Sequence, residues 1–210
     1  TDKYSHQPDE KLLENLGIKT PYVLFVGRIT RQKGLAHLLR AWREVSPEIG
    51  LVLAAGSPDE PAVGEEVGSL ISELQRHRNN VHWFEKMLPQ PQVRSLLSSA
   101  SLFICPSIYE PLGIVNLEAM ACQTAVLATR VGGIPEVVQD GITGELVDYT
   151  GDATHFEELI AQKITELMSN PDLLQRYAQA GRKRAVADFA WSSIAQQTLT
   201  LYKSILATHG

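Results

Sequence analysis

Short runs of apolar residues alternate along the chain with longer stretches in which apolar residues recur every three or four positions. An uninterrupted apolar run indicates a strand buried on both faces, and the wider spacing indicates an amphipathic helix. We predict strands over residues 22–26, 51–55, 81–84, 102–105, 125–129 and 145–147. We predict helices around Leu35, Leu38, Leu39 and Trp42, around Leu70, Ile71 and Leu74, around Val93, Leu96 and Leu97, from near Gly113, and over 135–138, 156–168, 172–188 and 191–206.

The alternation of buried strands with helices predicts the fold class. Strands that are apolar throughout belong to a parallel sheet covered by helices on both faces, and right-handed crossovers make that sheet doubly wound. We therefore expect an α/β fold, a Rossmann-like sheet of about six strands with C-terminal helices. The tail helices are expected to pack on the sheet, and the last one is long enough to reach toward a neighbouring domain.

The pattern divides one domain, residues 1–210, into three parts: an entry segment over 1–20, a parallel α/β core over 21–150 and a helical tail over 151–210. A chain of 210 residues is long enough to bury a sizeable core. Because the first residue is not Met, we expect a processed protein or a piece of a longer one, and we favour the second.

Composition narrows the classes of partner. Hydrophobic residues make up 44% of the chain, charged residues 20%, and the net charge of −5 argues against a general role on nucleic acids or membrane surfaces. No apolar run approaches the roughly 20 residues that cross a bilayer. Cys105 and Cys122 form no CxxC pair and are expected to be reduced and buried, and the six histidines lack metal-binding spacing. We expect a cytoplasmic protein without a metal site.

Three familiar site motifs are absent from the sequence. No GxGxxG fingerprint for nicotinamide or flavin dinucleotides follows a predicted strand, no P-loop GxxxxGKS or GxxxxGKT occurs, and no GxSxG marks a hydrolase elbow. Ligands of open parallel sheets bind beyond the carboxyl ends of the strands. The segments that follow the predicted strands are therefore the places to look for chemistry.

Three cations lie in the segment after the first strand, Gly27-Arg28-Ile29-Thr30-Arg31-Gln32-Lys33-Gly34. Gly27 is expected to let the backbone leave the strand sharply, and Gly34 to open the next helix. An arginine offers a fork of donors to phosphate oxygens, and a lysine supplies a movable point charge. Arg28 and Lys33 therefore suit a diphosphate, although a solvated surface loop has the same composition.

Two carboxylates, Glu110 and Glu118, flank Gly113 after the fourth strand. The helix predicted to begin near Gly113 has first-turn amides without internal partners, and these favour an anion. Carboxylates accept hydrogen bonds from neighbouring hydroxyls, as on a ribose or a hexose. Phosphate and hydroxyl groups occur together in a sugar nucleotide. An ordinary surface glutamate is the alternative for Glu118, but its apolar neighbours indicate a buried helix.

The segment after the fifth strand, Arg130-Val131-Gly132-Gly133-Ile134-Pro135-Glu136, contains two adjacent glycines. Gly132 and Gly133 permit close backbone approach, and Pro135 suits a first helical position. Alone, this signal is weak, because many strand-to-helix turns look alike. The Asp140-Gly141 turn further on is expected to be structural.

Together, Gly27-Arg28…Lys33-Gly34, the Glu110-x7-Glu118 pair and Gly132-Gly133-Ile134-Pro135-Glu136 resemble the retaining GT-B glycosyltransferases of the GT4 group. The resemblance covers essentially the whole chain, as the C-terminal, nucleotide-sugar-binding half of such an enzyme. Segments 27–34 and 108–122 are similar to those of actinobacterial-type glycogen synthases that use ADP-glucose. The resemblance implies that an N-terminal domain of the same parent protein, absent from this chain, binds the acceptor, either a glucan or a sugar phosphate.

The resemblance also implies a role for each matching residue. Arg28 and Lys33 would hold the donor diphosphate and, with Glu110 at the donor sugar, form the catalytic group. Glu118 would bind the ribose. Gly27 would be a further donor-binding position. The resemblance places Lys86 and Met87, in the loop after the third strand, near the base, and Leu112, Gly113 and Ile114 near the sugar and phosphate. Many relatives place a glycine near Glu85 and Lys86, so base recognition departs from the pattern here. No cofactor or metal is implied, since the two cations can replace a metal.

Three alternatives remain open from the sequence. The donor could be a UDP- or GDP-sugar, as for a mannosyltransferase. The chain could instead be a module that binds nucleotide sugars without catalysis. A sugar-nucleotide epimerase would need further acid–base groups in the ligand loops, and the sequence offers none beyond Glu110 and Glu118. For the isolated chain we expect weak donor binding and no turnover.

Overall fold

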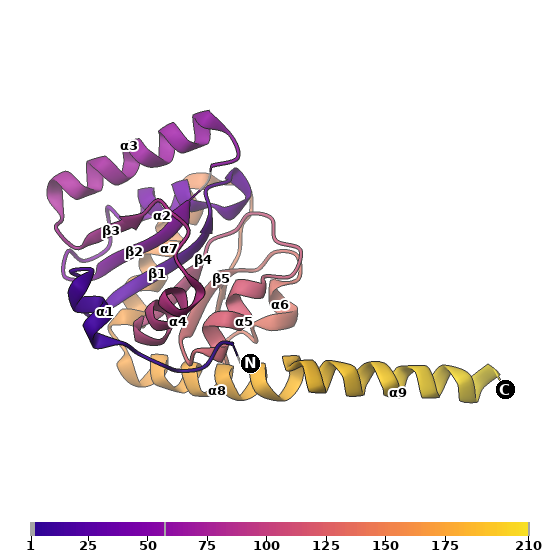
Figure 1. Ribbon diagram of the computed structural model, residues 1–210. Helices are drawn as coiled ribbons and strands as arrows, with labels where there is room; N and C mark the ends of the chain where they lie inside the picture. The colour runs from indigo at the N-terminus through magenta and orange to yellow at the C-terminus, as the bar shows by residue number, and fades with distance from the viewer. Residues whose placement is uncertain (1–2, 57, 210) are drawn as a thin grey trace.

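A computed structural model, which describes residues 3–56 and 58–209, has a parallel sheet of six strands at its centre (Figure 1). The strands are β1 (Tyr22–Arg28), β2 (Gly50–Gly56), β3 (Val81–Phe84), β4 (Leu102–Cys105), β5 (Ala125–Thr129) and β6 (Gly144–Val147). Their order in the sheet is β3-β2-β1-β4-β5-β6, and all neighbours run parallel. The strand order reverses between β1 and β4, which is where open α/β sheets bind ligands. The predicted Rossmann-like, doubly wound fold is confirmed.

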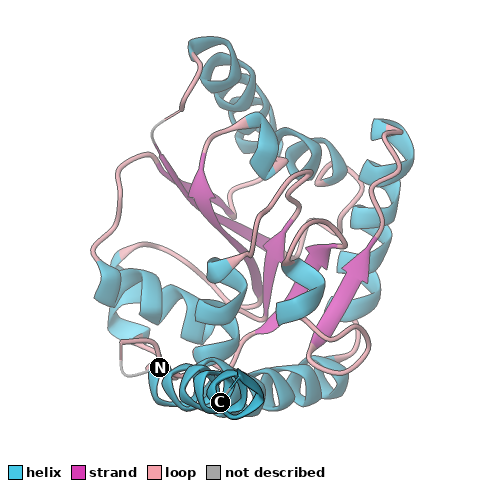
Figure 2. Cartoon of the chain, turned by 90° about the vertical axis from the view of Figure 1, so that its right-hand side faces the viewer, coloured by secondary structure: helices cyan, strands magenta, loops and turns pink. Residues whose placement is uncertain are grey.

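Helices cover both faces of the sheet (Figure 2). They are α1 (Glu10–Asn15), the 3-10 turn η1 (Arg31–Lys33), α2 (Leu35–Ala41), α3 (Pro61–His77), α4 (Gln90–Ser99), α5 (Ile114–Ala121), α6 (Ile134–Val137), α7 (Ala153–Met168), α8 (Pro171–Phe189) and α9 (Trp191–His209). One apolar core lies under α2, α3 and α7, and the other lies under α1, α4, α5 and α6. Alternate residues of β1 enter the two cores, Val23 and Phe25 the first, Tyr22 and Leu24 the second.

The strand boundaries agree closely with those predicted, and β3, β4 and β5 have the predicted bounds. The sharp exit predicted at Gly27 is wrong. β1 continues to Arg28 because Gly27 pairs with Ala55 and Arg28 with Gly56 across the β1–β2 ladder. The loop begins one residue later, so Arg28 is held by the sheet itself.

Helix α1 was not predicted, because only one of its six residues, Leu13, is buried and no apolar periodicity marks it. Its first turn is fixed by the Asp9 carboxylate, which accepts a hydrogen bond from the Leu12 amide. Both cysteines are buried and free, as expected.

The helical tail divides in two. Helices α7 and α8 pack on the body, as predicted, and α8 contributes Tyr177 to one core and Ala185 to the other. Helix α9 continues away from the body, so the expectation that the whole tail packs on the sheet is wrong for this helix (Figure 1). It carries the exposed apolar residues Trp191, Ile194, Leu199, Leu201, Tyr202, Ile205 and Leu206. Among the described helices, none combines the length and apolarity that crossing a bilayer requires.

Candidate functional site

The loops that follow β1 and β4 meet at the carboxyl edge of the sheet. The Ile108 amide donates to the Gln32 carbonyl over 2.8 Å, which ties the second loop to the first. Gly34 has φ +65°, and a Cβ added there would lie 1.9 Å from the Pro106 carbonyl oxygen. Only glycine allows this approach, so Gly34 opens α2 as predicted and also brings the two loops together.

This contact brings a predicted cation and a predicted carboxylate together. Lys33 Nζ lies 2.5 Å from Glu110 Oε2, and the exposed fractions of the two side chains are 24% and 11%. The Ser107 hydroxyl, which is fully buried, donates to the same oxygen over 3.4 Å. Sequence reasoning gave no role to Ser107, because its partner becomes visible only when the loop is folded. Lys33, Glu110 and Ser107 therefore form one hydrogen-bonded group at the sheet edge.

Arg28 lies at the end of β1, exposed, with no ion pair to any residue in 3–56 or 58–209. It borders a hollow of about 210 Å³ between the ends of β1 and β2, the β3–α4 loop and the start of α4. The hollow is lined by Val26, Gly27, Arg28, Ala54, Gly56, Lys86, Met87, Leu88 and Val93. It thus brings together four of the predicted site residues, Gly27 and Arg28 from the end of β1 and Lys86 and Met87 from the loop after β3.

A glycine in β2 explains why the loop after β3 reaches this hollow. A Cβ added to Gly56 would lie 2.3 Å from the Glu85 carbonyl oxygen, so a larger residue would push the loop away. Met87, on the same loop, is 88% exposed. A flexible, polarisable side chain in that position is free to cover a flat ligand held in the hollow.

The start of α5 carries the other predicted backbone positions. Gly113 has φ +81° and precedes the first helical residue, while Leu112 and Ile114 are exposed. The first-turn amides of α5 thus begin beside the Glu110 loop, as predicted.

The adjacent glycines after β5 make the close backbone approach that was predicted, and their partner is the Glu110 loop. Gly133 N donates to the Glu110 carbonyl over 3.1 Å. A Cβ added to Gly132 would lie 1.8 Å from the same oxygen. The loop after β5 therefore packs against the backbone of Glu110 and holds it in place.

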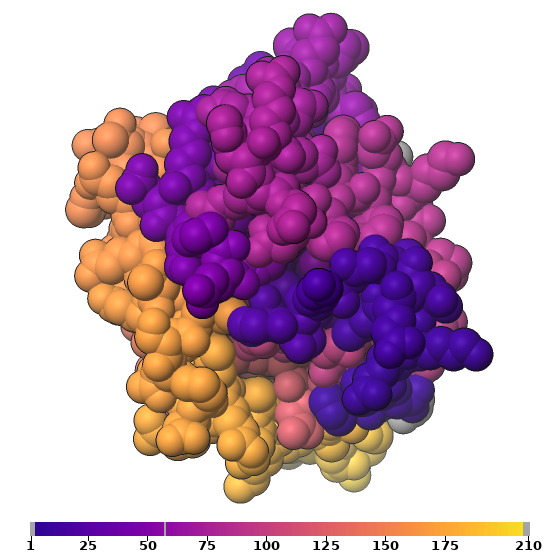
Figure 3. Space-filling view, turned by 90° about the vertical axis from the view of Figure 1, so that its left-hand side faces the viewer, coloured from indigo at the N-terminus to yellow at the C-terminus, as the bar shows by residue number. Residues whose placement is uncertain are grey.

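Glu118 lies half-buried on α5, and its partner comes from the N-terminal segment. Burial raises the pKa of this carboxyl group, and a hydrogen bond from the Tyr4 hydroxyl opposes the rise. The segment is held in place because Arg182 donates to the Tyr4 carbonyl over 3.2 Å and Gln90 to the Lys3 carbonyl over 3.0 Å. Figure 3 shows this indigo segment lying against the magenta part of the chain. Glu118 is therefore not an ordinary surface glutamate, and Tyr4 is a neighbour that the sequence did not reveal.

Replacing Glu118 by Gln is expected to stabilise the chain at neutral pH. Because the folded-state pKa lies above that of the unfolded chain, ionised Glu118 costs stability, and the cost disappears once the pH falls below the unfolded value. The gain in thermal midpoint of Glu118→Gln should therefore be largest at about pH 7 and vanish near pH 4. Thermal unfolding across this range is the measurement, with the exposed Glu48→Gln as control. A gain independent of pH would contradict the burial effect.

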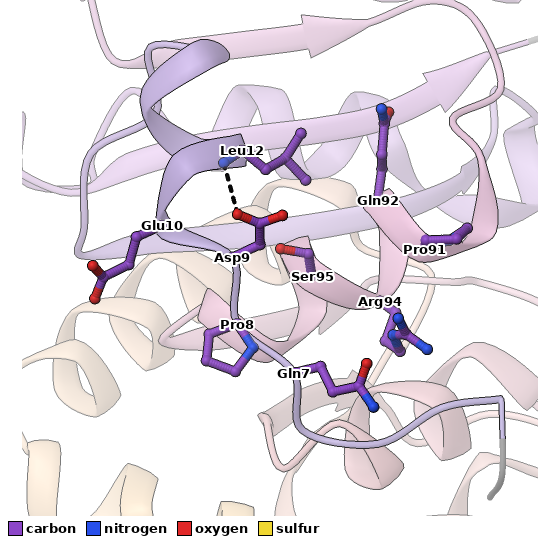
Figure 4. Close-up of a pocket in the computed structure, with 9 residues that line it drawn as sticks. All are labelled: Gln7, Pro8, Asp9, Glu10, Leu12, Pro91, Gln92, Arg94 and Ser95. Carbon is purple, nitrogen blue, oxygen red and sulfur yellow. Dashed lines mark hydrogen bonds between the residues drawn. The ribbon is translucent and has the colours of Figure 1, made fainter.

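A larger hollow, of about 660 Å³, lies between the N-terminal segment, α1 and α4. It is lined by Gln7, Pro8, Asp9, Glu10, Leu12, Pro91, Gln92, Arg94 and Ser95. Figure 4 shows the Asp9 carboxylate turned to the Leu12 amide, which it caps over 3.0 Å. The predicted site residues are not among these, and the hollow is separate from the site at the sheet edge.

The fold and the site define a Rossmann-like domain whose carboxyl sheet edge carries Arg28 and the Lys33–Glu110 pair. The chain belongs to the family described as glycosyl transferases group 1, whose model matches residues 9–184. The six-stranded sheet with its flanking helices matches GT-B glycosyltransferase domains.

Individual relatives share both sequence and structure with the chain. It is 51% identical over 203 residues to alpha-maltose-1-phosphate synthase of Mycolicibacterium smegmatis, covering 95% of this chain and 52% of the relative. It is 30% identical over 187 residues to glycogen synthase of Mycobacterium tuberculosis, covering 86% of this chain and 42% of the relative. The structure of sucrose-phosphate synthase from Thermosynechococcus elongatus superposes with a TM-score of 0.79 at 29% identity, covering 99% of this chain and 51% of that one. The chain therefore spans about half the length of the relatives it matches.

Proposed function

We propose that the chain is the donor-binding half of a retaining glucosyltransferase that uses ADP-glucose and transfers the glucosyl unit to a sugar phosphate. The name of the Mycolicibacterium relative supports the acceptor class. α-Maltose 1-phosphate consists of two glucose units and one phosphate, and joining a glucosyl unit to a glucose phosphate yields it. The more distant likeness to a glycogen synthase supports a longer α-glucan as the alternative acceptor.

The observation that carries the proposal is the Lys33–Glu110 pair, which joins the loops after β1 and β4 where the strand order reverses, with Arg28 at the end of β1. Departure of the nucleoside diphosphate builds negative charge on its phosphates, and preorganised cations stabilise that charge. In the proposed mechanism Arg28 and Lys33 perform this task without a metal ion.

The donor's hydroxyl groups need acceptors, which the carboxylates supply. We assign Glu110 to the donor sugar and Glu118 to the ribose. The base is assigned to the hollow lined by Lys86 and Met87. The backbone at 112–114 then faces the sugar and the phosphates.

The acceptor and the second domain also belong to the proposal. Relatives are about twice as long as this chain, and we place acceptor binding in a further, N-terminal domain of the parent protein. The exposed apolar side chains of α9 would be covered by that domain, because a surface of this kind is costly in water. A cytoplasmic location is part of the same proposal.

Calorimetry on the chain with ADP-glucose, UDP-glucose and GDP-mannose tests the donor assignment. We expect ADP-glucose to bind most tightly and Lys183→Ala, an exposed cation on α8, to leave binding unchanged. Preference for another donor would redirect the assignment to that sugar nucleotide, and no binding to any of them by the folded chain would falsify it. Turnover by the parent protein, with glucose 1-phosphate or a maltooligosaccharide, then separates the two acceptors. Donor binding without turnover there would indicate a binding module.

A further inference from the structure

Asn116, the third residue of α5, is buried without a hydrogen-bond partner for its side chain. Its exposed fraction is 0%, and neither its Nδ2 nor its Oδ1 atom bonds to any residue in the described part of the chain. Burying an amide in this way is costly, because the group gives up its hydrogen bonds to water without replacing them. Unexplained costs of this kind tend to occur at functional sites, where another state of the molecule uses the group.

The position of the amide indicates which neighbour could use it. A Cβ added to Gly113 would lie 2.6 Å from Asn116 Nδ2 and 3.5 Å from Glu110 Cγ. The amide and the Glu110 side chain therefore both border the point where a side chain at Gly113 would begin. In the chain without donor, the Glu110 carboxylate is occupied by Lys33 and by the Ser107 hydroxyl.

When the donor binds, its diphosphate competes with Glu110 for the Lys33 ammonium. A lysine ammonium is a mobile point charge, and a diphosphate carries more negative charge than one carboxylate. As Lys33 turns toward the phosphates, the Glu110 carboxylate, in a residue only 9% exposed, loses a charged donor. A buried carboxylate needs a replacement donor, and Ser107 supplies only one hydrogen bond.

We propose that Asn116 is a positioning residue of the donor site. When Lys33 turns from Glu110 to the donor diphosphate, the Asn116 amide replaces it as hydrogen-bond donor to the Glu110 carboxylate. With Nδ2 donating to one carboxylate oxygen, the other oxygen is held toward the donor sugar. This inference rests on the proposed function and adds a residue and a rearrangement to it. A purely structural Asn116 would make no difference to ligands.

The test compares Asn116→Leu, in which the side chain has the same number of non-hydrogen atoms, with the wild-type chain in two measurements. Thermal unfolding should show a higher midpoint for the variant, since two unpaired polar atoms are removed. Calorimetry should show about tenfold weaker binding of ADP-glucose and little change for ADP, because Glu110 serves the sugar and not the nucleotide. Asn116→Asp keeps the size but removes the NH₂ donor, and it should lose the same sugar-dependent part of binding if the Leu variant folds poorly.

Ser95→Ala is the matched control. The Ser95 hydroxyl on α4 is also buried without a partner among the described residues, but it lies in the wall of the separate larger hollow. This control should leave binding of ADP and ADP-glucose unchanged.

Wild-type affinity for ADP-glucose in both Asn116 variants, or an equal loss of affinity for ADP and ADP-glucose, would overturn the positioning role. If the wild-type chain binds ADP-glucose no more tightly than ADP, the positioning role fails while the nucleotide site stands. If the folded chain binds no sugar nucleotide, the proposed function itself fails.

Discussion

Lys33→Ala is expected to weaken binding of a nucleoside diphosphate sugar by about 1.5–3 kcal/mol, the range for hydrogen bonds to charged groups. This corresponds to about a 10- to 150-fold loss of affinity. The ammonium is partly buried against Glu110, at 2.5 Å, and so lies close to where the donor sugar is assigned. Arg28→Ala should have an effect in the same range, since Arg28 has no competing ion pair among the residues described. Calorimetry with ADP-glucose and ADP is the measurement.

A double-mutant cycle separates the two tasks of Lys33. If the ammonium only neutralised Glu110, then Lys33→Ala would have little effect on ADP binding once Glu110 is replaced by Gln. We expect the loss of ADP affinity to persist in the Glu110→Gln background, because the phosphates are bound directly. The exposed Lys183→Ala again serves as control. Unchanged affinity in both Lys33→Ala and Arg28→Ala would rule out the diphosphate role.

The sheet and the loops that carry the site could be predicted because both depend on local features of the sequence. Uninterrupted apolar runs such as Leu102–Cys105 are typical of strands buried on both faces of a parallel sheet, and this run forms β4. All strands of a parallel sheet end at one edge, so Lys33 and Glu110 could be expected on that edge although they lie 77 positions apart. Their direct contact follows from the strand order, in which β1 and β4 are neighbours, and that order was not predicted.

Contacts that depend on the folded backbone could not be predicted. Nothing in the sequence shows that Gly132 approaches the Glu110 carbonyl rather than a ligand, or that Tyr4 reaches Glu118. Asn116 stands within the recognised segment, but its lack of a partner is a property of the packed state. Helix α9 has the same local pattern as a packed helix, yet it continues away from the body.

Gly34→Ala is expected to destabilise the folded chain, because it combines backbone strain with a clash. A φ of +65° costs a residue with a Cβ about 1–2 kcal/mol. The added Cβ would also lie 1.9 Å from the Pro106 carbonyl oxygen, and moving that backbone should cost about 1–3 kcal/mol more. The free energy of unfolding should fall by the sum of the two effects, measured by denaturant titration.

Gly17→Ala carries the backbone strain without the clash, since Gly17 has φ +68° but nothing within 4 Å of an added Cβ. The two variants share the strain, so their difference reports the contact between the loops. That contact also aligns Lys33 with Glu110, through the hydrogen bond from the Ile108 amide to the Gln32 carbonyl. Gly34→Ala should therefore lose affinity for ADP-glucose even under conditions where it remains folded, while Gly17→Ala keeps it. Equal stability and equal affinity in the two variants would show that the close approach of the loops does not build the site.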